Sequence, residues 1–199
     1  MRRVLMAAAL AVCAGAAWAA APLELLFETP HMRAVQPGET LRYAHVRTAD
    51  PALGVGEDFH RVIALEMGQG QAARFTLDAD GAPRVYPVAD GVPGNPLLMV
   101  FLENTLRTVA SATGGSAFYL RNRIRYALRD GIAVGGDGAL TIHPFENDAN
   151  RARMGPFGDL EMRFEVSQAQ PGMIVAMRAR AGNAGKPDYI EEIRLEDAQ

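Results

Sequence analysis

The sequence predicts an α+β protein in which one large, curved antiparallel sheet, an unclosed half-barrel, is covered on one face by a helical hairpin. Two observations lead to this fold class. Apolar residues alternate with period two from Leu23 to Val88, follow helical spacing from Asn95 to Asp130, and alternate again from Ile132 to the end. The 199 residues are also 49% hydrophobic and 22% charged, which is typical of one globular domain.

The first segment predicts a strand meander. Strands are expected around Leu41 to Val46, Phe59 to Met67, Ala73 to Leu77 and Val85 to Val88. Asp78 to Gly81 forms a hairpin turn signal, because Asp and Gly tolerate positive φ. Short turns join only antiparallel neighbours, so four or five antiparallel strands should follow one another here.

The middle segment has clear signals for two helices. Asn95 is a good N-cap and Pro96 suits the first helical position, where its missing N–H is not needed. Gly114-Gly115 ends this helix, Ser116 can cap a second one, and Gly131 ends that one. The short connection predicts a helical hairpin.

The last segment predicts strands again. Between Leu160 and Val166, apolar residues alternate with Glu161, Arg163 and Glu165, which indicates one buried and one solvated face. After Pro171-Gly172, the same pattern places Met173, Val175 and Met177 on the buried face, opposite Ile174, Ala176 and Arg178. Further strands are expected at Leu140 to Ile142 and Tyr189 to Leu195.

The first nineteen residues are typical of a secretory signal peptide. Met1-Arg2-Arg3 is basic, Val4 to Ala17 is apolar, and Ala17-Trp18-Ala19 fits signal peptidase cleavage after Ala19. A single domain, 20–199, would remain in the bacterial periplasm. The alternative is a lipoprotein attached through Cys13, because Leu10 to Cys13 resembles a lipobox.

An arginine stripe on the second predicted helix is the first candidate binding feature. Arg121, Arg125 and Arg129 recur every four residues, with Asn122 between them, in a chain of net charge −3. Guanidinium groups suit carboxylate and phosphate oxygens, so Arg121, Asn122 and Arg125 are candidate contacts for an anionic head group or membrane surface. Alternatively, the stripe is a solvated helix face paired with surface carboxylates.

An apolar face rich in methionine is the second candidate feature. Methionine side chains adapt to irregular apolar ligands, although they also fill gaps in ordinary cores. The candidate contacts for a lipid-like ligand are Met67, Phe75, Met162, Phe164, Met173 and Met177.

Catalytic and metal sites are not indicated. His143 and Met154 match half of a copper-carrier motif whose second half is absent, and residues 146–150 lack a calcium loop's central Gly and are interpreted as an exposed polar turn. We therefore expect no metal, no cofactor and no catalytic residue. An enzyme would need a non-local cluster of His45, His60 or His143 with carboxylates. Nucleic acid is excluded as a partner by the acidic balance and the expected compartment.

The order of strands, helix pair and strands resembles that of the LolA-like periplasmic lipoprotein and lipid carriers. The resemblance implies a curved sheet that wraps around helices and binds acyl chains beneath it. The segments Gly94-Asn95-Pro96, Gly114-Gly115-Ser116 and Arg121-Asn122-Arg123 also resemble a signature of secreted proteins from Gram-negative bacteria.

Two hypotheses for the function remain open. The first is a periplasmic binding or carrier protein for an apolar ligand such as a lipid, which can also be anionic. The second is an envelope accessory or assembly protein that binds a protein partner through its arginine-rich helix or a sheet edge.

Overall fold

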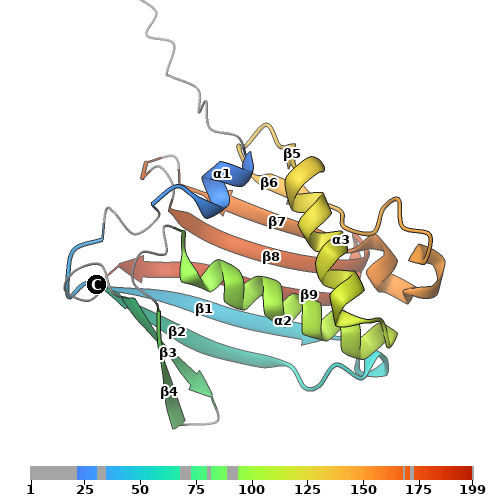
Figure 1. The fold of residues 1–199 in the computed structure, drawn as a ribbon. Coiled ribbons are helices and arrows are strands. Elements are labelled where there is room, and N and C mark those ends of the chain that lie inside the picture. The colour runs from blue at the N-terminus through green and yellow to red at the C-terminus, as the bar shows by residue number, and fades with distance from the viewer. Residues whose placement is uncertain are drawn as a thin grey trace, which may run out of the picture.

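The computed structural model describes residues 22–30, 35–67, 73–79, 82–88, 94–167, 169–170 and 173–198. The expected signal peptide, 1–19, and Cys13 lie outside these residues. The predicted fold class is confirmed: a curved, unclosed antiparallel sheet has helices packed on one of its faces (Figure 1).

Nine strands within the described residues form this one sheet. Its strand order is β4-β3-β2-β1-β9-β8-β7-β6-β5, so the chain builds each half as a meander and joins the halves through β1 and β9. The strands are β1 (Thr40–Ala49), β2 (Phe59–Met67), β3 (Ala73–Ala79), β4 (Ala82–Pro87), β5 (Ala133–Val134), β6 (Leu140–Ile142), β7 (Glu161–Val166), β8 (Ile174–Asn183) and β9 (Lys186–Ala198).

The two predicted helices are α2 (Pro96–Thr113) and α3 (Ala117–Asp130). The Asn95 side chain caps α2 by accepting a hydrogen bond from the Leu97 N–H at 2.9 Å. Gly114 ends α2 with φ +65°, a left-handed conformation that favours glycine. Ser116 precedes α3 as predicted, but its side chain makes no capping hydrogen bond.

The segment that begins at Leu23 was expected to form strands, and this expectation is wrong. It forms a short helix, α1 (Pro22–Phe27), whose Leu25 and Leu26 are buried in the core. The periodicity of such a short apolar run does not distinguish a strand from a helix.

The core lies between the helices and the inner face of the sheet, the face that they cover. Leu120, Ile124 and Leu128 of α3 point into it, and Phe101 of α2 packs edge-to-face on Phe164 of β7 with ring centroids 5.8 Å apart. One continuous core contains buried residues of α1, α2, α3, β1, β2, β6, β7, β8 and β9.

One alternation in the predicted strands is broken. A register shift at Glu165/Val166 marks a bulge between β7 and β8. The bulge leaves Ile174 fully buried, although strict alternation placed it on the solvated face.

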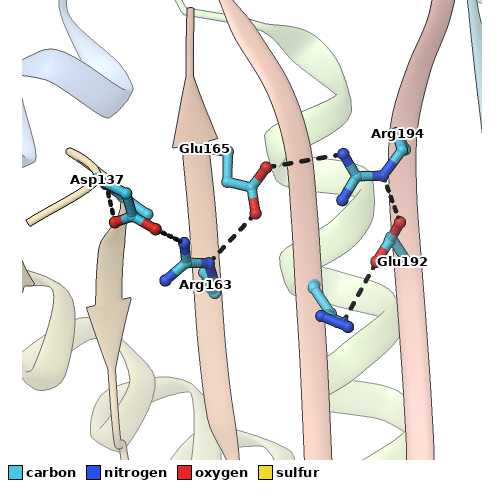
Figure 2. Close-up of polar contacts among 7 residues, drawn as sticks. Asp137, Arg163, Glu165, Glu192 and Arg194 are labelled. Atoms are coloured by element: carbon cyan, nitrogen blue, oxygen red, sulfur yellow. Dashed lines mark hydrogen bonds and ion pairs between the residues drawn. The ribbon is translucent and has the colours of Figure 1, made fainter. Parts of the chain in front are cut away.

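The outer face of the sheet carries a chain of ion pairs across three strands (Figure 2). Arg163 of β7 pairs with Asp137 and, at 3.2 Å, with Glu165. Glu165 reaches Arg194 of β9 at 3.7 Å across β8, and Arg194 pairs with Glu192 at 2.6 Å. These charges are the solvated half of the alternation seen in the sequence.

Candidate functional site

The predicted apolar contacts lie in the hydrophobic core. Five of them are only 0–6% exposed, and the sixth, Phe75 of β3, is half-buried and packs against the same core. The five are Met67, Met162, Phe164, Met173 and Met177. A ligand that used them would have to displace protein side chains or part of the helical cover.

The predicted polar contacts lie on the other side of α3. Since Leu120, Ile124 and Leu128 face the sheet, Arg121 and Arg125 project outward. The structure therefore does not bring the predicted polar and apolar residues into one site.

We define the α3 face as the exposed surface formed by Phe118, Arg121, Asn122, Arg125, Tyr126 and Arg129. Phe118 is 73% exposed, which is unusual for so large an apolar side chain. Arg129 lies over the Tyr126 ring at 5.1 Å. The face thus combines guanidinium groups with exposed aromatic rings.

Cations outnumber anions on and beside the α3 face. Glu103 of α2 is shared between Arg121 at 3.2 Å and Arg107 at 3.0 Å. Burial raises the pKa of Glu103, but hydrogen bonds from Arg121 and Arg107 outweigh it and hold this pKa below its usual value. Arg125 donates to the Asn122 amide oxygen at 2.8 Å, and no carboxylate of the described residues lies within ion-pair distance of it.

A buried carboxylate, Asp148, anchors the start of α3. It accepts hydrogen bonds from the Tyr119 hydroxyl and the Asn150 N–H, each at 2.7 Å, and lies 2.8 Å from Arg123. Burial raises the pKa of Asp148, but these hydrogen bonds and the Arg123 charge outweigh burial. They hold the pKa of Asp148 below its usual value. Residues 146–150 were expected to be an exposed turn, which is wrong for Asp148.

A cleft of about 320 Å³ adjoins this anchor. It lies between the α2–α3 connection and the turn at residues 150–154, and Ser116, Tyr119 and Arg153 contribute to its walls. Arg153 is held by Asn150, whose Oδ1 accepts its hydrogen bond at 2.8 Å. The polar groups of the cleft are thus mostly used in contacts with one another.

A second polar cluster lies on the inner face, and no site was predicted there. We define the inner polar cluster as His45 and Arg47 of β1, Arg61 of β2, and Tyr189 and Glu191 of β9. His45 Nε2 lies 2.8 Å from Glu191 Oε1, and the Tyr189 hydroxyl donates to Glu191 Oε2 at 2.6 Å. His45 and Glu191 are each 1% exposed. Burial, with Glu191 alongside, raises the pKa of Tyr189 well above its usual value.

One signal for this cluster was present in the sequence. The alternation of β2 puts Arg61 on the same face as Phe59, Ile63 and Leu65, where an arginine interrupts an apolar series. Glu191 gives no such signal, because it stands beside Glu192 in an acidic pair that is typical of a solvated strand edge. His60 and His143 are exposed, so His45 alone of these three histidines joins the buried cluster.

Neither a membrane-spanning helix nor a metal site is found in the described part of the chain. No helix there is long and apolar enough to cross a bilayer. No group of three or more His, Cys, Asp or Glu side chains there could hold a metal ion.

The protein is thus an α+β protein with an open antiparallel sheet, and it carries two polar regions, the α3 face and the inner polar cluster. No protein-family model matches the chain, and no curated protein matches its sequence.

Proposed function

We propose that this protein is a periplasmic binding or carrier protein for an apolar ligand that can also be anionic, a lipid being the simplest class. The observation that carries the proposal is the α3 face, where Arg125 and the highly exposed Phe118 lie together on one side of a helix.

The chemistry of the α3 face suits lipid at a membrane surface. Guanidinium groups bind phosphate oxygens with several hydrogen bonds at once, and an aromatic ring inserts at the level of the head groups. No carboxylate of the described residues pairs with Arg125, and the Glu103 that pairs with Arg121 is shared with Arg107. Arg121 and Arg125 can therefore bind an anion without first losing a strong partner. Because the chain as a whole is acidic, the attraction should be local to this face.

Vesicle co-sedimentation tests this surface directly. Wild-type protein should bind phosphatidylglycerol vesicles more tightly than phosphatidylcholine vesicles, and the preference should fall with added salt. The double variant Arg121→Gln/Arg125→Gln should weaken binding to the anionic vesicles by roughly tenfold or more, at about 1 kcal/mol per arginine. Arg84→Gln, at an exposed arginine on β4, is the matched control.

Two results would contradict the proposal. One is equal binding of the wild type to both kinds of vesicle. The other is an equal loss of binding in the Arg84 control. Native mass spectrometry after gentle extraction then tests carriage: a carrier retains lipid in solution, whereas a protein that only docks on the membrane does not.

A second candidate function is that of an envelope accessory protein that binds a protein partner. It is favoured by the closely packed methionines of the inner face and by the exposed edge strand β4, where Val85 is 61% exposed. Such a protein would bind its partner without lipid, and Val85→Lys should weaken that binding because a charged edge opposes strand addition.

A further inference from the structure

Charged side chains gather at one end of the otherwise apolar inner face. In the sheet register, His45 is opposite Arg61, and Arg47 is opposite both Phe59 and Glu191. Directly opposed residues point to the same face, so these side chains from β1, β2 and β9 are neighbours. His45 and Glu191 form a buried floor, and the half-buried Arg47, Phe59 and Arg61 form a rim.

The two arginines are held in place around one aromatic ring. The guanidinium carbons of Arg61 and Arg47 lie 3.8 Å and 4.7 Å from the centre of the Phe59 ring. Arg47 also donates from Nη2 to the Glu57 carbonyl oxygen at 2.6 Å. Gly56 lets this loop approach, because a Cβ there would lie 3.1 Å from Arg47 Nη2. The positive charge at the rim is therefore fixed in position.

The carboxylate within the cluster does not pair with Arg47. Both oxygens of Glu191 are taken, one by His45 and the other by Tyr189. No carboxylate of the described residues lies within ion-pair distance of Arg47. The buried Nε of Arg47 and the buried Nδ1 of His45 have no hydrogen-bond partner there either. A buried guanidinium N–H without an acceptor is costly, and an anionic oxygen is the acceptor that suits it best.

We propose that the inner polar cluster is a binding site for an oxyanion, a carboxylate or a phosphate, held by Arg47 and Arg61 against His45. The site is separate from the α3 face and does not depend on it. The oxyanion is either free in solution or the head group of an amphiphile. Both sources share the same recognition chemistry.

Isothermal titration calorimetry with four probes tests the site. The probes are inorganic phosphate, acetate, octanoate and octanol. The wild type should bind at least one of the anions, and octanoate more tightly than octanol. Arg47→Gln and Arg61→Gln should each weaken anion binding by about tenfold, since each removes a charge-assisted hydrogen-bond donor. Arg84→Gln, at an exposed arginine on β4, is the matched control and should bind as the wild type does.

The probes also distinguish the two sources. Binding of phosphate or acetate alone identifies a site for a free oxyanion, and binding of octanoate without phosphate or acetate identifies an amphiphile. The inference is overturned if the wild type binds none of the anions, if both rim variants bind as the wild type does, or if the Arg84 control loses binding equally. Failure of vesicle binding leaves this result untouched, because the two experiments probe different surfaces.

A measurement on the wild type covers the case in which the rim variants do not fold. In NMR spectra, the His45 ring signals should shift on titration with the bound anion, while those of His60, exposed on the opposite face of β2, stay in place. No shift of the His45 signals, or an equal shift of both, would overturn the inference.

Discussion

Single side chains connect the helices to the sheet, and Asn95 is the clearest case. Its Oδ1 caps α2 and its Nδ2 donates to the Tyr43 hydroxyl on β1 at 3.1 Å. One buried residue therefore begins the helix and fixes it against the strand. Ser116 occupies the equivalent position before α3, but its side chain neither caps the helix nor bonds to one of the described strands.

This difference predicts unequal effects on stability. Asn95→Ala should lower the free energy of unfolding by about 2 kcal/mol, because it removes a cap and a buried hydrogen bond. Ser116→Ala should change it by less than about 0.5 kcal/mol. Urea denaturation of both variants is the measurement, and equal effects would show that Asn95 has no special role.

The Tyr43 hydroxyl also predicts a loss of stability at alkaline pH. Burial raises the pKa of Tyr43 to about 12, against 10.0 for an unperturbed tyrosine. The unfolded chain then loses this proton before the folded chain does, so stability is complete below pH 10 and falls as pH rises towards 12. The slope should reach about 1.4 kcal/mol per pH unit for this group. Denaturation curves between pH 9 and 12 check it, and Tyr43→Phe should flatten the fall.

At the scale of elements, β9 presents opposite environments on its two faces. Glu191 points to the inner face and is fully buried with His45. Glu192 points to the outer face, where Arg178 and Arg194 lie 3.3 Å and 2.6 Å away in the ion-pair chain of Figure 2. Adjacent residues of the same type thus compare a buried hydrogen-bonded carboxylate with a more exposed ion-paired carboxylate within one strand.

Glu192→Gln should lower the free energy of unfolding by less than about 1 kcal/mol, because exposed pairs are weak and screened by salt. Glu191→Gln should lower it by about 3 kcal/mol, because it disrupts the buried contacts of this carboxylate with both His45 and Tyr189. Thermal or urea unfolding at 0.05 and 1 M NaCl measures both. A larger effect from Glu192 would mean that the outer ion pairs stabilise the sheet more than the inner one.

The helices were predicted more accurately than the sites. Asn95, Pro96 and Gly114 are local signals, and α2 begins and ends where they indicate. The outward direction of Arg121 and Arg125 also followed from helical spacing. The pairing of Glu191 with His45, 146 positions apart in the sequence, depends on which strands become neighbours, and no local pattern specifies that.

At the scale of the whole molecule, the sheet should not open uniformly. β4 is an edge strand that pairs with β3 alone, and its side chains from Pro83 to Pro87 are exposed. β9 is paired on both sides and carries buried residues such as Ile193.

Amide hydrogen exchange should therefore be fastest in β4 and slowest in β1 and β9, because edge strands open without disrupting the core. Mass spectrometry of exchanged peptides measures this order. Equal protection of β4 and β9 would indicate that β4 is covered in solution, as binding of a partner to this edge would require.

The alternating pattern predicted the sheet and its solvated face, since burial of one face determines which residues alternate. It did not predict the order of strands. The pairing of β1 with β9 brings Tyr43 beside Leu195, across most of the chain, and no turn signal reports such a contact. The short helix α1 was missed for a different reason, because an apolar run of its length fits either structure.

The position of β9 has a consequence for synthesis. Of the nine described strands, β9 is made last, and it fills the gap between the two meanders. An incomplete chain therefore exposes β1 and β8 as open edges, and the domain can become native only after residue 186 and those beyond it are released. Removal of these residues should leave two unjoined halves rather than a smaller version of the same fold.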